Sequence, residues 1–152
     1  MNVADAIRNY MQKNGIGLQK IADQTGIPPE AVKEWLDGRS EPKEYLIPLI
    51  EFQLKYGGAG KVMPVPELVR KVAEICQKNG VEHLSLFGSF ATGTATETSD
   101  IDFVVYGCKD IMELEEKLEV IDTLRKIDIF DHDQIRNEYL LEDIKDYGKQ
   151  IY

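Results

Sequence analysis

The sequence predicts an α+β protein with two parts: an all-helical N-terminal domain over residues 1–56 and a small α/β domain with a mixed sheet over residues 66–152. Two observations predict this division. Apolar residues recur at three- and four-residue spacing as far as Leu54, which is typical of amphipathic helices. After residue 65, helical and strand patterns alternate, which is typical of a layered α/β structure.

The N-terminal part contains four helical patterns. Each has apolar residues on one face and ends at a glycine or begins at a proline. Their inward positions are Val3, Ile7, Tyr10 and Met11, then Leu18, Ile21 and Ala22, then Ala31, Val32, Trp35 and Leu36, then Leu46, Ile47, Leu49, Ile50 and Leu54. The single tryptophan, Trp35, lies at one of these inward positions, so we expect it in the core and not at a ligand site.

A glycine-rich segment, Tyr56 to Lys61, separates the two parts, and Pro64 and Pro66 follow it. Glycine interrupts helices and proline begins new ones, so residues 57–65 are predicted to be a linker. The Gly60-Lys61 pair is not a phosphate-binding P-loop. That motif requires Gly where Lys55 stands and Ser or Thr where Val62 stands.

The C-terminal part alternates between helical and strand patterns. The expected elements are a helix over 66–78, strands over 83–87 and 100–106, a helix over 112–124, a strand over 126–130, and one or two helices over 134–147. Alternation of this kind predicts a small sheet covered by helices.

Composition excludes several classes of protein. The chain has 152 residues, 43% of them hydrophobic, and no apolar run approaches the about 18 residues of a membrane-spanning helix. No signal peptide is evident in MNVADAIRNYMQK, and the two cysteines, Cys76 and Cys108, make no disulfide framework. We therefore expect a cytoplasmic protein without a membrane partner. His83 and His132 have no Cys/His cluster beside them, so a zinc site is not expected, and His132 is expected at the surface.

Charge is divided unevenly between the two parts. Residues 1–60 carry seven basic and eight acidic side chains, whereas residues 61–152 carry eleven and nineteen, for a net charge of −9 overall. Such a chain has no general attraction to DNA or to an anionic membrane. An acidic half suits a site for hard cations such as Mg²⁺, although most of these charges are expected on the solvated surface.

The candidate site lies on the predicted strands. Gly88 and Ser89 follow the first strand, where a backbone turn entering a helix offers N–H groups to phosphate oxygens. Asp100 and Asp102 occupy alternate positions, so their carboxylates face one side while Ile101 faces the core. Asp128 lies in an otherwise apolar strand, where a carboxylate requires compensation. Three carboxylates beside a phosphate-binding turn are the groups that two-metal phosphoryl transfer uses.

The stretch Gly88-Ser89-Phe90-Ala91-Thr92-Gly93, followed by Ser99-Asp100-Ile101-Asp102-Phe103, resembles the signature of the DNA polymerase β-like nucleotidyltransferase superfamily, and of its minimal nucleotidyltransferases in particular. The resemblance extends from about Pro66 to Tyr152. It implies that Gly88, Ser89 and Thr92 contact the nucleotide, and that Asp100, Asp102 and Asp128 are catalytic and hold the metal. The family commonly has Arg where this chain has Thr92, and the missing cation near the phosphates is expected to lower activity or change the nucleotide preference.

The resemblance also implies cofactors and partners. Mg²⁺, as two ions, or alternatively Mn²⁺, would be the cofactor, and ATP the substrate. Minimal nucleotidyltransferases are typically paired with a helical HEPN-family protein, often a toxic ribonuclease encoded nearby. An antitoxin that transfers AMP to a hydroxyl of such a partner is the function expected. Two alternatives remain: a DNA-binding regulator with a weak or inactive transferase domain, and a nucleotidyltransferase for a small-molecule acceptor.

The stretch from Leu18 to Pro42 resembles the helix-turn-helix of Cro and repressor proteins, over about residues 1–57. The recognition helix would run from Pro28 to Leu36. It carries Glu30 and Glu34 against Lys33, so we expect weak binding to random duplex DNA. Specific DNA, a homodimer, or a docking role for this domain all remain open.

Overall fold

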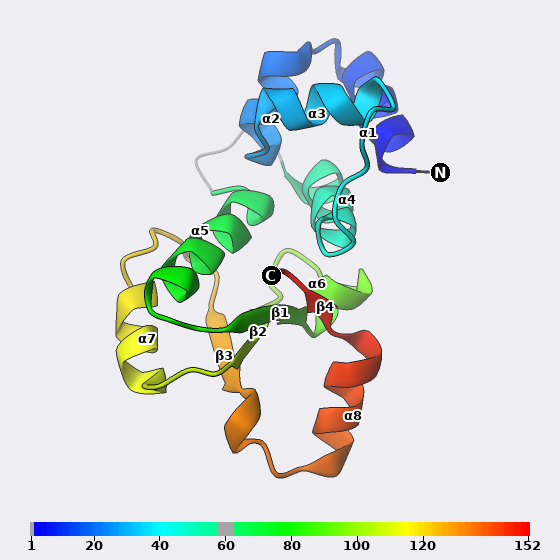
Figure 1. Cartoon of the computed structure of the whole chain (residues 1–152). Coiled ribbons are helices and arrows are strands. Elements are labelled where there is room, and N and C mark those ends of the chain that lie inside the picture. The colour runs from blue at the N-terminus through cyan, green and yellow to red at the C-terminus, as the bar shows by residue number, and fades with distance from the viewer. Residues whose placement is uncertain (1, 58–62) are drawn as a thin grey trace.

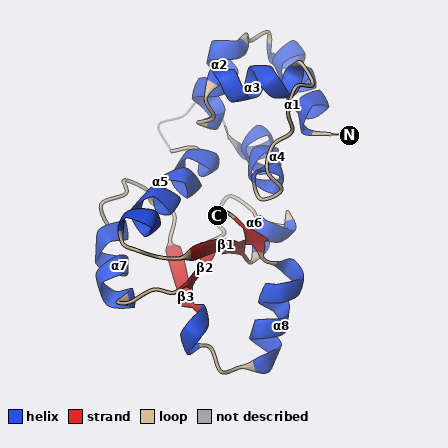
Figure 2. Cartoon of the chain, in the orientation of Figure 1, coloured by secondary structure: helices blue, strands red, loops and turns tan. Residues whose placement is uncertain are grey.

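The fold is that of a computed structural model, which describes residues 2–57 and 63–152. A group of N-terminal helices lies against a second unit built on a four-stranded sheet (Figure 1). The sheet contains both parallel and antiparallel pairs, and helices lie beside it (Figure 2). The expected α+β class with a mixed sheet is confirmed. Among the described residues, no helix is both long and apolar enough to cross a bilayer.

The N-terminal region forms the four expected helices. Their bounds are α1 (Val3–Asn14), α2 (Leu18–Thr25), α3 (Pro29–Leu36) and α4 (Leu46–Tyr56). The Asn2 side chain accepts a hydrogen bond from the Asp5 N–H and so caps α1, while Gly15 and Gly26 end α1 and α2 in the left-handed conformation. Trp35 is buried in the hydrophobic cluster of these helices, as expected.

Helix α4 belongs to two hydrophobic clusters. Ile50 packs with the N-terminal helices, whereas Leu49 and Phe52 pack into the cluster that covers the sheet. Gln53 adds polar contacts between the two parts, because its amide nitrogen donates to the Gln24 carbonyl and its oxygen accepts from the Val65 N–H. The N-terminal helices are therefore attached to the sheet unit through α4.

The predicted linker, 57–65, falls largely outside the described residues, since 58–62 are not described. The next helix already begins at Val65, the last residue of that segment. The helix-turn-helix assignment and the domain limits 1–56 and 66–152 stay predictions.

The rest of the chain alternates between helices and strands. In order these are α5 (Val65–Lys78), β1 (His83–Phe87), α6 (Ser89–Thr92), β2 (Ile101–Tyr106), α7 (Ile111–Leu118), β3 (Ile127–Asp131), the 3₁₀ turn η1 (His132–Gln134), α8 (Glu138–Tyr147) and β4 (Lys149–Gln150). The strand order is β3-β2-β1-β4, in which β2 and β3 are parallel and the other pairs antiparallel.

The two faces of the sheet differ in chemistry. Alternate residues of β2 (Ile101, Phe103 and Val105) are fully buried against α5 and α7. The opposite face carries Asp102, which lies between Ile101 and Phe103 in β2, and Asp128, which is opposite Asp102 in β3. Ile101 therefore faces the core as expected, and the carboxylates face away from it.

The predicted helix over 112–124 is wrong at its C-terminal end, because α7 ends at Leu118. The Ile121 N–H turns back to the Leu118 carbonyl, and the β-branched Val120, Ile121 and Thr123 that follow favour extended backbone. The chain must also cross to the edge of the sheet before β3 begins. Leu124, expected in this helix, is fully exposed.

Smaller differences concern the strand ends. The strand expected from Asp100 begins at Ile101, and that expected over 126–130 runs from Ile127 to Asp131. The helical pattern expected from Gln134 is preceded by the turn η1, and regular helix begins only at Glu138. The two-residue β4 was not predicted, because such a short strand has no periodicity and exists only through pairing with β1.

Candidate active site

Asp102 and Asp128 are neighbours across the parallel pair β2–β3. Their Cα atoms are directly opposite each other in the strand register. Burial, reinforced by the Asp128 carboxylate and more weakly by Asp100, raises the pKa of Asp102 to about 6. Two carboxylates held this close favour a proton or a cation between them.

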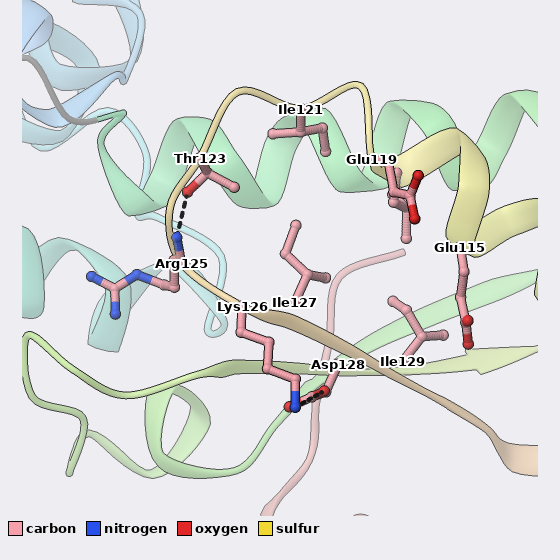
Figure 3. Close-up of a pocket in the computed structure, with 10 residues that line it drawn as sticks. Glu115, Glu119, Ile121, Thr123, Arg125, Lys126, Ile127, Asp128 and Ile129 are labelled. Atoms are coloured by element: carbon pink, nitrogen blue, oxygen red, sulfur yellow. Dashed lines mark hydrogen bonds and ion pairs between the residues drawn. The ribbon is translucent and has the colours of Figure 1, made fainter.

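Asp128 has a cationic neighbour in Lys126. Its Oδ1 lies 3.5 Å from the Lys126 Nζ; the Lys126 side chain is mostly exposed and that of Asp128 is half-buried. Figure 3 shows this pair on one side of β3, with Ile127 and Ile129 on the other. Asp128 is therefore accessible to solvent, although its neighbours in the sequence, Ile127 and Ile129, are apolar.

Asp100 lies in the turn before β2 and is exposed. It is close enough to act electrostatically on both Asp102 and Arg125. The structure thus brings Asp102 and Asp128 together, with Asp100 at the entrance to the same strand.

Gly88 connects β1 to α6 directly beside Asp102. Its φ of 73° and ψ of −153° lie in a region that only glycine adopts readily. A Cβ at this position would collide with the Asp102 Oδ2 atom. Glycine is therefore required here for two reasons, the backbone conformation and the close approach of the carboxylate.

Ser89 begins α6, where the first backbone N–H groups have no acceptor within the helix. The Ala91 and Thr92 N–H groups donate to the Gly88 carbonyl, which closes the turn. Thr92 is exposed, and its hydroxyl lies 3.0 Å from that of Thr94. The Thr92 hydroxyl is thus engaged with its own loop.

Arg125 was not among the predicted site residues. Its Nη1 donates to the carbonyls of Ser99, at 2.6 Å, and Glu97, at 3.3 Å. Its guanidinium carbon lies 5.1 Å from the Phe90 ring centre and 5.3 Å from that of Phe52. A cation here holds the turn that leads to Asp100 and joins it to α6 and α4. The sequence signal was weak, a basic residue just before the strand that carries Asp128.

Replacing Arg125 tests this bracing role. We expect Arg125→Ala to lower the melting temperature by about 4–8 °C, because stacking on two rings and two hydrogen bonds are lost together. Arg125→Lys keeps the charge but not the planar fork, so it should recover only part of the loss. Thermal unfolding followed by circular dichroism measures both variants, and equal melting of Arg125→Ala and the wild type would contradict the role.

Lys149 is a second residue that sequence reasoning missed. It lies in β4, and its Nζ donates to the Ala91 carbonyl in α6 at 2.7 Å. Lysine at the C-terminal end of a helix also interacts favourably with the helix dipole. Lys149 therefore holds the Gly88–Thr92 turn from the opposite edge of the sheet.

The remaining expectations on ligands concern metal. Among residues 2–57 and 63–152, no three His, Cys, Asp or Glu side chains are already arranged to hold a metal ion. The oxygen donors of Asp102 and Asp128, with the raised pKa of Asp102, nevertheless suit a hard cation.

His132 is half-buried and stacks on Tyr106, with ring centres 4.4 Å apart, so it lies less exposed than expected.

The C-terminal part of the chain is similar to known proteins. The family model "Polymerase beta, Nucleotidyltransferase" matches residues 70–152, more than half of the chain. The chain belongs to this nucleotidyltransferase family. The matched region contains the Gly88–Thr92 turn and all three carboxylates.

The nucleotidyltransferase also has named relatives in Methanocaldococcus jannaschii. Two of them, both called "Putative protein adenylyltransferase", are 35% identical to it. One match covers 54% of this chain and 89% of the relative, and the other covers 48% and 83%. A solved structure described as "Crystal structure of the toxin-antitoxin with AMP-PNP" is 28% identical with a TM-score of 0.45, over 55% of this chain and 71% of that one.

Proposed function

We propose that this nucleotidyltransferase transfers AMP from ATP to a hydroxyl of a protein acceptor. The observation that carries the proposal is the pairing of Asp102 and Asp128 beside the Gly88–Ser89 turn. The relatives named as protein adenylyltransferases support a protein acceptor and an adenylyl group.

Asp100, Asp102 and Asp128 would hold the metal, two Mg²⁺ ions or Mn²⁺ in their place. When bound, such ions neutralise the triphosphate and favour ionisation of the acceptor hydroxyl. The raised pKa of Asp102 fits this assignment, because a cation offsets both the cost of burying the charge and the repulsion from Asp128.

The chain's own groups have separate roles. The backbone N–H groups at Ser89, with its hydroxyl, bind the triphosphate, and Gly88 allows that turn to approach Asp102. The acceptor oxygen attacks the α-phosphorus, the bond to the β-phosphate oxygen breaks, and pyrophosphate leaves. Asp128, which lies in the edge strand β3, takes the proton from the acceptor hydroxyl. Thr92 lines the turn and supplies no charge.

A helical HEPN-family protein encoded nearby, acting as a toxin, is the partner we propose, which makes the chain a cytoplasmic antitoxin. The small size of the transferase unit supports a macromolecular acceptor over a small molecule. Asp128 is partly exposed in the edge strand of the sheet, so a protein segment can reach it.

The test is a transfer assay with the protein encoded by the neighbouring gene, ATP and Mg²⁺, read by intact mass. We expect one or more AMP additions to that protein, absent with Asp102→Asn. AMP adds negative charge and a large planar base, which would block an RNA-binding surface on the partner. Stable complex formation without a mass change, with ATP and with each other NTP, would leave a binding antitoxin and refute the enzymatic proposal.

A second candidate function is DNA-bound regulation through the N-terminal helices. Its supporting observation is that α2 and α3 form at the expected positions, joined by the short segment 26–28. The exposed side chains of α3 include Glu30, Lys33 and Glu34, so this surface has little attraction for phosphate. With these charges on α3, DNA binding would require a homodimer that recognises a specific promoter site.

A further inference from the structure

The outer edge of β3 is free. Strand β3 is the last in the sheet, and within residues 2–57 and 63–152 no other strand pairs with its outer side. The Ile101 N–H donates to the Lys126 carbonyl at 3.0 Å. In a parallel pair with this register, Asp128 directs its backbone groups to β2, so those of Ile127 and Ile129 point outward.

A cavity of about 530 Å³ lies beside this edge. Side chains of β3, α7 and the loop between them line it: Glu115, Leu118, Glu119, Ile121, Thr123, Arg125, Lys126, Ile127, Asp128 and Ile129. Figure 3 shows Ile121, Ile127 and Ile129 around it, with Glu115 and Glu119 at one end. The same loop exposes two large apolar side chains, Val120 at 77% and Leu124 at 101%. Exposed apolar groups beside an unpaired edge are typical of a binding surface.

The position of Asp128 relates this edge to the reaction. Phe87, Asp102 and Asp128 lie in one row across β1, β2 and β3, because each is opposite the next in the strand register. A further strand on the outer edge would continue the row at about 4.8 Å. A residue opposite Asp128 in that strand would have its Cβ roughly 4.5–5.5 Å from that of Asp128, on the same face.

We propose that an extended segment of the protein acceptor adds to β3 as a fifth strand, and that its hydroxyl-bearing residue lies opposite Asp128. The inference rests on the proposed function and names how the acceptor docks at that site. Backbone hydrogen bonds to Ile127 and Ile129 would provide affinity, and the alternation of side chains would direct the hydroxyl to the carboxylates.

The cavity defines the neighbours of the acceptor residue. In an extended segment, the residues on either side point to the opposite face, over the cavity. Leu118 and Ile121 favour an apolar side chain there, and Glu115 and Glu119 favour Lys or Arg. The expected acceptor is therefore a Tyr, Ser or Thr flanked by Leu or Ile on one side and a basic residue on the other.

Synthetic peptides test the docking without a transfer step. The probes are ten-residue peptides with one central Tyr between Leu and Lys, and control peptides have Glu in place of Lys. Amide hydrogen exchange by NMR on the full chain should show the Ile127 and Ile129 amides protected by the Lys peptides. Absence of protection with every peptide would overturn the proposal. Protection of both amides before peptide is added, together with a dimeric mass, would overturn it in favour of a second copy at this edge.

A pair of variants separates the backbone contact from the side chain. Ile129→Pro removes the outward N–H, whereas Ile129→Ala removes only side-chain atoms, and proline is tolerated at an edge position of this kind. We expect the proline variant to bind the Lys peptide at least about tenfold more weakly than the alanine variant. Equal affinities would contradict the added strand.

Modified peptides give the same information with the protein unchanged. N-methylation of alternate peptide amides should weaken binding for one alternating set and leave the other unaffected, since only one set faces β3. Equal effects of both methylated sets would overturn the proposal.

The double variant Glu115→Lys/Glu119→Lys should reverse the preference between Lys and Glu peptides by about fivefold. Peptide protection without any AMP addition would instead refute the enzymatic function and retain the docking edge.

Discussion

Asp102→Asn is expected to lower nucleotidyl transfer by roughly 10²–10³-fold or more, while it stabilises the folded chain. The loss follows because the amide cannot hold a cation beside Asp128. The gain follows because the amide removes a charge that burial and Asp128 disfavour, as the pKa of about 6 indicates.

The pH dependence of that stabilisation has a definite sign. A carboxyl whose pKa is raised in the folded state destabilises the fold when it is charged, so the penalty is complete above about pH 6 and disappears as the pH falls below the ordinary value of 3.8. Because Asp102 is only half-buried, solvent screening reduces the effect to ~1 kcal/mol, or about 2–4 °C in melting temperature for a chain of this size.

The control is Asp122→Asn, which removes the same charge from an exposed position in the loop before β3. Melting of both variants and of the wild type, without metal, is measured between pH 4 and pH 8. Asp102→Asn should exceed Asp122→Asn in melting temperature at pH 7.5, and the three proteins should converge near pH 4. No excess at pH 7.5 would show that neither burial nor Asp128 disfavours the charge on Asp102.

Gly88→Ala should reduce transfer by about 10²-fold through displacement of the nucleotide-binding turn. Its Cβ would meet the Asp102 carboxylate at a φ of 73°, so either the turn or Asp102 must move. Displacements of about 1 Å at a reacting group have effects of this size. Steady-state transfer and ATP binding by calorimetry are the measurements.

Gly93→Ala is the matched control at the other end of α6. Gly93 also has a positive φ, 78°, but a Cβ there would have no neighbour within 4 Å. Both variants should lose stability from the strained backbone, and only Gly88→Ala should lose transfer on this scale. Similar transfer rates for the two variants would mean that close approach to Asp102 is not needed.

Local patterns were sufficient for much of this fold. Helical spacing and the glycine and proline signals defined α1 to α5, and the alternation in His83–Phe87 predicted β1 with the bounds that the structure has. The end of α7 could not be read in the same way, because Val120 and Ile121 fit a helical face as well as an extended chain. Helix α7 ends at Leu118 because the chain must then extend to the edge of the sheet, where β3 begins.

The candidate site shows the same division. Gly88, Ser89, Asp100 and Asp102 are close in sequence, so their spacing alone predicted a turn followed by two carboxylates. Sequence could offer Asp128 as a third carboxylate, but only the parallel register of β2 and β3 places it opposite Asp102, where its charge adds to the effect of burial on the pKa of Asp102.

Sequence by itself determined the class of the fold, most of its helices, and the residues available for phosphate and metal chemistry, because these depend on short-range periodicity and residue type. Tertiary structure alone decided the partners of Arg125 and Lys149, the existence of β4, and which edge of the sheet stays open. Those features depend on hydrogen bonds and packing between segments far apart in the chain. A short stretch of sequence does not show these interactions.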